Sequence, residues 1–368
     1  MVPYLVLGFV ALGLTFVATP VVRWFAIRIG AIDQPSDRKV HARPTPTLGG
    51  LALFIGIFGA GAIALLMPDF RDEFRGSAEP LGILAGGLVI FVLGAVDDLR
   101  DLPAPVKLAG QVFASGILFL SGVKWRFVLL PDSLYSLSDD VSVLVTVLWL
   151  VAMINAVNLV DGLDGLAAGI CGIAAASFFV YTYQLDQAGS LQFAGLAPIV
   201  AIVIVGATLG FLRHNFHPAR IFMGDSGSMF LGLILGAATV IGVGRAPINP
   251  STSDAFLAYT PLIIPLMVVA LPIVDSLLAI ARRARRRRSL FHADREHLHH
   301  RLMDLGHGHR QAVLVMYVWS ALAAGAGLAF TSPDRSDLVF ALPIAVGAIV
   351  VYTLFPVLTK ALQDRLSS

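Results

Sequence analysis

The chain is poor in charged residues, which make up only 14% of its 368 amino acids. A soluble globular domain carries about 25%, so the composition argues against one. The sequence has a single cysteine, Cys171, which excludes an intrachain disulfide and which we interpret as a small packing residue. The first apolar run also lacks a basic segment before it, because Arg23 and Arg28 follow it. This order argues against a signal peptide and favours a first span that is retained.

Hydrophobic residues are abundant and make up 57% of the chain. They gather in runs of about 16–22 residues, the length that a helix needs to cross a bilayer. We therefore predict an all-α, polytopic integral membrane protein with about eleven transmembrane helices and no internal repeat. The predicted spans are 2–22, 49–67, 81–96, 106–122, 142–157, 165–184, 195–212, 227–243, 259–281, 311–330 and 338–356.

Positive charge gives these spans a predicted orientation. Of the 26 Lys and Arg residues, 20 fall in the C-terminus and one alternating set of connections. Basic connections stay in the cytoplasm, so we expect the N-terminus outside and the C-terminus cytoplasmic. We treat residues 1–368 as one domain embedded in the inner (plasma) membrane. Its polar segments lie in the expected cytoplasmic loops 23–48, 97–107, 158–164, 212–226 and 281–310.

The first cytoplasmic loop carries Arg38, Lys39 and His41 and ends in Pro-Thr-Leu-Gly-Gly at Gly50. Its prolines and glycines predict an ordered, turn-rich loop. The basic side chains either anchor the topology or bind an anionic group beside the membrane, and the loop alone leaves both interpretations open.

Two adjacent acids, Asp97 and Asp98, follow the third predicted span. Carboxylates at a membrane edge are costly unless a cation neutralises them, and Mg²⁺ prefers oxygen ligands. Lys107 and Gln111 lie four residues apart on one helix face, so both are able to point at the same site. A solvated helix end is the alternative interpretation of the acids.

The densest polar segment, Asn155–Leu166, reads N-A-V-N-L-V-D-G-L-D-G-L. If the helix continues through it, Asn155 and Asn158 share one face, and so do Asp161 and Asp164. The two glycines permit close backbone approach or a helix break. A capped helix-ending turn is the alternative. Unpaired polar groups near a bilayer cost several kcal/mol, so we expect a bound polyanion and a metal ion here.

Asp225 lies in Met-Gly-Asp-Ser-Gly-Ser, just before a span predicted to begin near Gly227. Amide groups at a helix N-terminus bind anions, and the glycine leaves room for a phosphate. The alternative is a simple N-cap made by Asp225 or Ser226.

The longest basic loop contains His297, His299 and His300 after six arginines. No cysteine or acid completes a zinc-like set there, so we favour phosphate binding or proton handling over a zinc site. Surface histidines are the alternative, and most of the arginines are interpreted as topology anchors or lipid contacts. Asp275, predicted about 10 Å inside the preceding span, is either functional or a buried structural acid.

Taken together, the five polar segments resemble those of the polyprenyl-phosphate N-acetylhexosamine-1-phosphate transferases. That family has R-K-x-H ending in P-T-x-G-G, then D-D-x-x-D, N-x-x-N-x-x-D-G-x-D-G-L, G-D-x-G-S and H-x-H-H. All five occur in this order over residues 33–302. The histidine pattern is similar to the branch that transfers GlcNAc-1-phosphate. The branch that transfers phospho-MurNAc-pentapeptide, which usually carries H-H-H after a proline, is the alternative.

The resemblance implies roles for individual residues. Asp225 and Asn158 would bind Mg²⁺, with Mn²⁺ as a substitute, and Asp97 and Asp98 would lie beside the metal and the lipid phosphate. Asp164 would recognise uracil, with Asp161 nearby as a further catalytic candidate. The remaining implied site residues contact phosphate, nucleotide or sugar, and they are Arg38, Lys39, His41, Lys107, Asn155, His297, His299, His300 and Arg301.

The implied reaction is attack of undecaprenyl-type phosphate on the β-phosphorus of UDP-GlcNAc. UMP leaves, and the lipid-PP-GlcNAc product starts a cell-envelope polysaccharide. A phosphate monoester is largely dianionic at pH 7, so we rank direct attack above Asp97 as a general base and above an aspartyl-phosphate route. The expected partners are a UDP-sugar, polyprenyl phosphate and the bilayer, with no nucleic acid and the homodimer left open. The alternative class is an ion-coupled transporter, which would place its acids near the membrane midplane.

Overall fold

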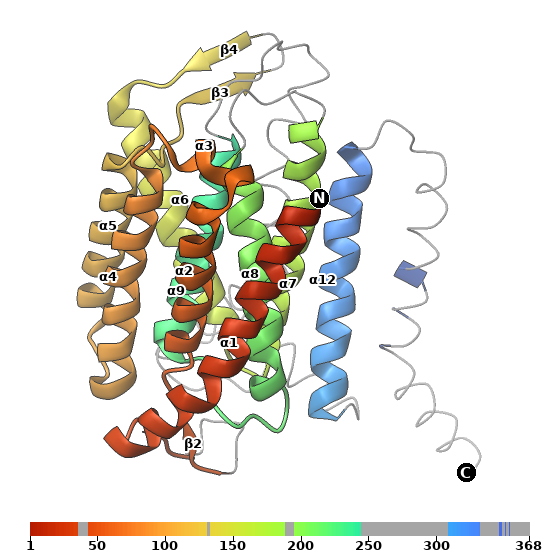
Figure 1. The fold of residues 1–368 in the computed structure, drawn as a ribbon. Coiled ribbons are helices and arrows are strands. Elements are labelled where there is room, and N and C mark those ends of the chain that lie inside the picture. The colour runs from red at the N-terminus through yellow and green to blue at the C-terminus, as the bar shows by residue number, and fades with distance from the viewer. Residues whose placement is uncertain are drawn as a thin grey trace, which may run out of the picture.

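In a computed structural model the chain forms a bundle of long helices whose axes run roughly side by side (Figure 1). The structure describes residues 1–35, 43–130, 133–187, 195–243 and 308–331, with four isolated positions at 346, 347, 350 and 353. The long helices are α1 (Val2–Ile29), α2 (Gly50–Leu66), α4 (Glu79–Arg100), α5 (Ala104–Leu120), α6 (Asp139–Val160), α7 (Leu166–Gln187), α8 (Leu196–Asn215), α9 (Gly224–Val243) and α12 (His309–Thr331).

These nine helices coincide with nine of the predicted spans. Seven are long and apolar enough to cross a membrane, within the described part of the chain. An eighth span is possible if α2 is joined with Pro68–Phe74, which contains η1 (Pro68–Phe70) and α3 (Arg71–Phe74) and bends away by 94°. The apolar helix α5 is shorter, with 17 residues. A polytopic helical membrane protein is confirmed, whereas the count of eleven and the orientation stay predictions, because spans 259–281 and 338–356 lie outside the described residues.

Several helices continue past the apolar run that predicts them. α1 ends at Ile29 rather than near residue 22, and α4 ends at Arg100 rather than near residue 96. Asp97 and Asp98 therefore lie on the last turns of α4, so the predicted 97–107 loop was wrong in its bounds. Hydrophobicity marks where a helix meets lipid, whereas a helix ends where its backbone hydrogen bonds end.

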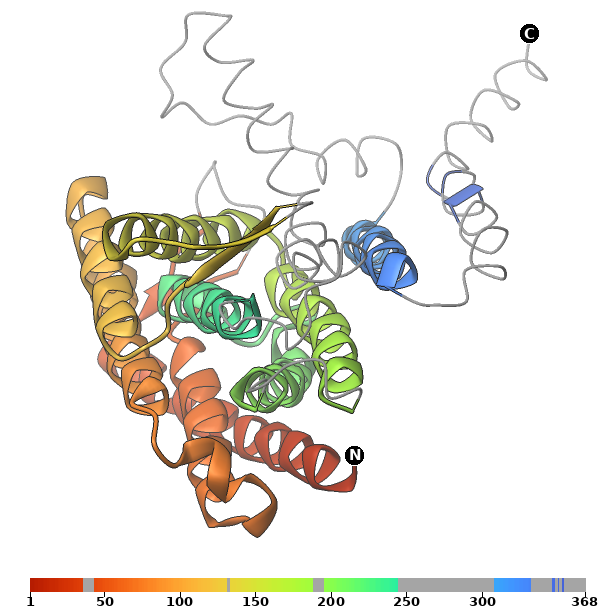
Figure 2. The ribbon, with the colours of Figure 1, turned by 90° about the horizontal axis from the view of Figure 1, so that it is seen from above.

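Helix α9 occupies the middle of the bundle. It packs against α2, α4, α6, α7 and α8, and the view from above shows it enclosed by them (Figure 2). Glycine permits these close crossings: a Cβ atom added at Gly232 would lie 2.7 Å from the Cα of Ile154 on α6. The outer helices α1 and α12 pack chiefly against α8 and α7, respectively.

Two small antiparallel hairpins supplement the helices, at opposite ends of the bundle (Figure 1). β1 (Ile32–Asp33) pairs with β2 (Thr45–Pro46), and β3 (Phe127–Leu130) pairs with β4 (Ser133–Ser136). The second hairpin fills part of the 123–141 connector that separates two predicted spans. The first lies at the end where α4 and α6 finish and α9 begins, which is also where the polar side chains gather.

Candidate active site

The N-terminus of α9 is held by the carboxylate of Asp98 from α4. Its Oδ1 accepts the backbone N–H of Asp225 at 2.8 Å, and its Oδ2 accepts the hydroxyl of Ser226 at 2.8 Å and the N–H of Ser226 at 3.2 Å. A carboxylate satisfies unpaired N–H groups at a helix start and complements the positive end of the helix dipole. Both oxygens of Asp98 are thereby engaged in placing Asp225.

The glycines of the Pro-Thr-Leu-Gly-Gly segment allow α2 and α9 to begin against each other. Gly49 N–H donates to the carbonyl of Phe222, and Gly50 N–H donates to the carbonyl of Met223, both at 3.0 Å. A Cβ atom at Gly50 would lie 2.6 Å from the Cα of Gly227, which is closer than real Cβ contacts allow. These glycines are thus required by backbone packing beside the site.

Lys107 of α5 bridges two carboxylates from different helices. Its Nζ lies 2.5 Å from Oδ2 of Asp97 and 3.2 Å from Oδ2 of Asp225. Oδ1 of Asp97 accepts the N–H of Leu102 at 2.7 Å, so this carboxylate also fixes the short link between α4 and α5. The ammonium group brings positive charge directly to these two carboxylates.

Asn158 on α6 faces Asp225 across the site. Its Nδ2 donates to Oδ1 of Asp225 and to Oγ of Ser228, both at 3.0 Å. Both amide protons are used, so its Oδ1 is left to accept or to ligate, without a partner among the described residues. The sequence prediction that Asn158 and Asp225 act on one site is supported by this contact, and their metal-binding role stays a prediction.

Asp161 lies in the turn between α6, which ends at Val160, and α7, which begins at Leu166. The helix therefore does not continue through Asp161 and Asp164, and the structure agrees with the alternative of a helix-ending turn within the predicted loop 158–164. The left-handed conformation of Gly165, with φ of 81°, helps to turn the chain. Burial, together with the nearby carboxylates of Asp225, Asp98 and Asp164, raises the pKa of Asp161 to about 8.

The donor atoms at this end of the bundle fit a hard divalent cation. Asp225, Asp161 and the free Oδ1 of Asn158 are oxygen donors, the type that Mg²⁺ prefers. Burial and the negative charge of neighbouring carboxylates both raise the pKa of Asp161, whereas Lys107 pairs with Asp97 and Asp225. A bound cation would relieve this repulsion and favour the ionised carboxylate.

Asn155, one turn before Asn158 on α6, is engaged inside the bundle. Its Nδ2 donates to Oε1 of Gln111 at 2.7 Å and to the carbonyl of Val151 at 2.8 Å. Gln111 in turn contacts the sulfur of Met229 at 3.5 Å. The two carboxamides cross-link α5 and α6 below Lys107, and substrate binding by Asn155 stays a prediction.

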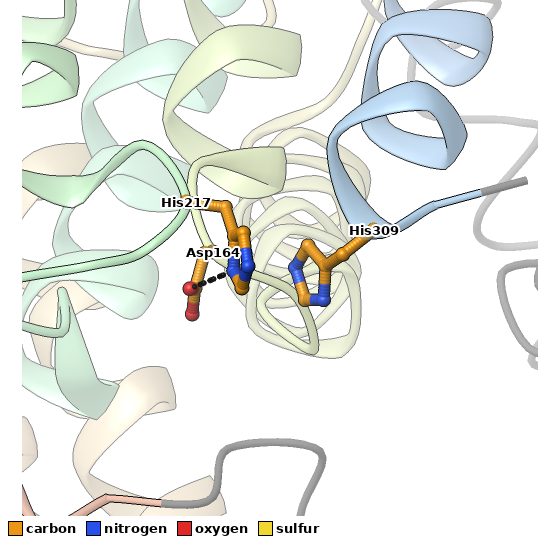
Figure 3. Close-up of side chains that lie close together, drawn as sticks. All are labelled: Asp164, His217 and His309. Atoms are coloured by element: carbon orange, nitrogen blue, oxygen red, sulfur yellow. Dashed lines mark hydrogen bonds and ion pairs between the residues drawn. The ribbon is translucent and has the colours of Figure 1, made fainter.

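A second polar cluster joins Asp164, His217 and His309 (Figure 3). Oδ2 of Asp164 accepts the N–H of Ala219 at 3.1 Å and lies 2.7 Å from Nδ1 of His217. The His217 and His309 rings stack with centroids 4.1 Å apart. Two ligands bound to a tetrahedral zinc ion at about 2.0–2.1 Å would lie about 3.3 Å apart. The shorter contact between Asp164 and His217 is therefore a hydrogen bond, and the cluster is not arranged as a zinc centre.

Known sequences match this chain over most of its length. Residues 80–243 match the family described as glycosyl transferase family 4. Decaprenyl-phosphate N-acetylglucosaminephosphotransferase of Mycolicibacterium smegmatis is 41% identical over 96% of this chain and 88% of its own length. The chain belongs to glycosyl transferase family 4. It is a membrane phosphoglycosyltransferase of the polyprenyl-phosphate N-acetylhexosamine-1-phosphate transferase type.

Two further relatives of this family cover most of the chain. A probable undecaprenyl-phosphate N-acetylglucosaminyl 1-phosphate transferase of Bacillus subtilis is 37% identical, over 86% of this chain and 82% of that protein. The undecaprenyl-phosphate alpha-N-acetylglucosaminyl 1-phosphate transferase of Yersinia pestis is 32% identical, over 84% and 79%. The resemblance inferred from the five polar segments is therefore confirmed.

Several residues that shape this transferase site were not predicted to do so. Asn215 accepts the N–H of Gly165 with its Oδ1 and donates from Nδ2 to the carbonyl of Ile221, both at 3.0 Å. The hydroxyl of Tyr317 on α12 donates to the carbonyl of Gly165. The contact of Asn215 with Gly165 has a sequence signal, because Asn215 begins the polar segment Asn-Phe-His-Pro shortly before Asp225. Nothing in the sequence marks Tyr317, which lies 152 residues from Gly165.

Part of the predicted site lies outside the described residues. This applies to the basic side chains of the first loop, to the histidine segment of the long basic loop and to the intramembrane acid before it. The residues are Arg38, Lys39, His41, Asp275, His297, His299, His300 and Arg301. Their roles stay predictions.

Proposed function

We propose that the protein transfers GlcNAc-1-phosphate from UDP-GlcNAc to a polyprenyl phosphate, releasing UMP and forming lipid-PP-GlcNAc. The observation that carries this proposal is the joining of Lys107, Asp97, Asp225 and Asn158 at one end of an apolar bundle. Oxygen donors for a cation and an ammonium group for a phosphate meet where a lipid headgroup would lie. The relatives named above act, by their names, on decaprenyl or undecaprenyl phosphate and N-acetylglucosamine.

Two anionic reactants must approach each other in this reaction. Asp225 and Asn158, with Asp161 beside them, would hold Mg²⁺, and the ion when bound would neutralise charge on the diphosphate. Lys107 supplies a fixed positive charge for a phosphate group. Asp98 keeps Asp225 in place through the start of α9.

The nucleophile needs little help from a base. The second pKa of a phosphate monoester is near 6, so the lipid phosphate is already largely dianionic at pH 7. Asp97 is paired with Lys107 and bonded to the N–H of Leu102, which suits a positioning role. We therefore propose direct attack, with inversion at phosphorus.

The membrane setting supports a lipid acceptor. On α5, several apolar side chains beside Lys107 are exposed outside the bundle: Val106, Leu108, Val112 and Phe113. A polyprenyl chain lying against this helix would bring its phosphate to Lys107. Because basic residues gather in one set of connections, we propose that the site opens to the cytoplasm from the plasma membrane.

The decisive experiment uses the purified full-length protein in detergent or nanodiscs. It is incubated with undecaprenyl or decaprenyl phosphate, Mg²⁺ and competing UDP-sugars, and released UMP and lipid product are quantified. UDP-GlcNAc should be the preferred donor, and Asp225→Ala should lose at least 100-fold in turnover, about 2.7 kcal/mol. Preference for UDP-MurNAc-pentapeptide, or no UMP release from any donor, would overturn the proposal.

A further inference from the structure

The carboxylate of Asp164 is held on one side only. Oδ2 accepts both the N–H of Ala219 and a hydrogen bond from His217. Oδ1 has no hydrogen-bond partner among the described residues, although the side chain is only 12% exposed. One oxygen is therefore anchored, and the other is left as an acceptor at a fixed position.

His217 is itself fixed by the first turn of α12. The ring of His309 stacks on it with an angle of 18° between the planes, and Nε of Arg310 donates to the carbonyl of His217 at 2.8 Å. Figure 3 shows His217 between Asp164 and His309. α12 follows the part of the chain that matches the family description, residues 80–243.

The contact also specifies the state of the His217 ring. A carboxylate oxygen that already accepts the N–H of Ala219 is an acceptor, so Nδ1 of His217 carries the proton and donates. A charge-assisted hydrogen bond of this kind is about twice as strong as a neutral one. It gives His217 the means to hold Asp164 in one orientation.

We propose that His217, supported by His309, is a positioning residue that holds Asp164 so that Oδ1 accepts the N3–H of the donor uracil. The inference rests on the proposed UDP-sugar reaction and on the uracil-binding role that the resemblance implies for Asp164, and it adds His217 and His309 as the groups that hold this carboxylate. Uracil has a donor at N3, whereas cytosine has an acceptor there. A fixed carboxylate oxygen would thus favour UDP-sugars over CDP-sugars, because the wrong base leaves buried polar groups unpaired.

The test compares His217→Phe with His217→Asn. Phenylalanine keeps the stack on His309 but cannot donate, whereas asparagine offers an N–H from Nδ2, close to the place of Nδ1. His214→Phe is the matched control, because the His214 ring packs near Phe16, with centroids 5.1 Å apart. UMP affinity is measured by calorimetry, and KM and kcat are measured for UDP-GlcNAc and CDP-GlcNAc.

We expect His217→Phe to weaken UMP binding and raise the KM for UDP-GlcNAc about tenfold, with kcat within about twofold of the wild type. Its preference for UDP-GlcNAc over CDP-GlcNAc should fall, and His217→Asn should restore both properties. The inference is overturned if His217→Phe leaves UMP affinity unchanged, or if only kcat or the melting temperature falls. A wild-type protein that binds UMP in this His217-dependent way but releases none from UDP-GlcNAc would instead contradict the proposed reaction.

Discussion

Asp98 shows how a residue expected beside the metal acts through the backbone. Three hydrogen bonds from Asp225 and Ser226 converge on its two oxygens. In Asp98→Asn, an NH₂ group would face those donors, and a lost hydrogen bond to a charged group costs about 1.5–3 kcal/mol. We expect a lower melting temperature and a tenfold or greater loss of kcat, measured by thermal unfolding and UMP release.

Asp101→Asn is the control for Asp98→Asn. Asp101 is exposed and has a φ of 47°, a conformation that asparagine tolerates. Its replacement should leave both measurements close to wild type. Full activity of Asp98→Asn would show that the cap does not place Asp225.

Asp161 predicts a pH dependence of stability. Its pKa is about 8 in the folded protein against 3.8 for the free side chain, so the folded state keeps a proton that the unfolded state has lost. The free energy of unfolding therefore falls as the pH rises from about 4 to 8. Asp161→Asn lacks this ionisation, so its stability does not fall in this way. The melting temperature of Asp161→Asn minus that of the wild type, both measured in EDTA, should therefore increase from pH 5 to pH 8.5.

Asp72→Asn is the control for this pH series. The Asp72 side chain is 96% exposed, so its replacement should shift the melting temperature little at either pH. A constant difference between Asp161→Asn and the wild type across the series would contradict the raised pKa.

At the residue scale, the sequence predicted which side chains meet but not what each one does. The motif acids and amides were recognised because dense polarity is rare at a membrane edge. Asp98 and Asn155 look like ligands in the sequence, yet their polar atoms bond to backbone or to neighbouring side chains. Such partners depend on helix packing, which a one-dimensional pattern does not encode.

At the scale of elements, small residues decide how closely α4 and α9 approach. A Cβ atom at Gly94 would lie 2.5 Å from the carbonyl oxygen of Asp225 and 2.5 Å from the Cα of Ser226. Because these are backbone atoms, Gly94→Ala must push α4 and α9 apart. We expect a melting temperature lower by several degrees and a marked loss of turnover.

Gly116→Ala provides the matched control on α5. No atom lies within 4 Å of a Cβ atom added there, and alanine favours a helix more than glycine does. Its melting temperature and turnover should equal or exceed those of the wild type. Equal behaviour of the two alanine variants would contradict the proposed crowding at Gly94.

Helix positions were predictable because lipid imposes long apolar runs, and nine runs became nine helices. Their exact ends were not, because α4 continues through Asp97 and Asp98, and α6 continues past the predicted span end at 157 before it stops at Val160. The stop depends on the turn around Gly165, which Asn215 and Tyr317 support from other helices. Tertiary contacts, rather than local sequence, therefore set the limits that position the site.

For the whole molecule, the proposed cation should couple binding to folding. A ligand that binds only the folded state stabilises it by about 2.7 kcal/mol at a concentration of 100 Kd. Saturating Mg²⁺ should therefore raise the melting temperature of the wild type, and Asp225→Ala should abolish the rise. Asp139→Ala is the control, because Asp139 is 92% exposed and lies at the other end of α6. This variant should show the same rise in melting temperature with Mg²⁺ as the wild type.

The central position of α9 has a consequence for how the protein assembles. The helices that enclose it, α2, α4, α6, α7 and α8, all precede it in the chain. Its first turns carry Asp225, two serines and two glycines, which makes this end a poor partner for lipid alone. During synthesis, α9 therefore enters the membrane beside neighbours already made. The earlier helices, rather than lipid, then surround its polar first turns.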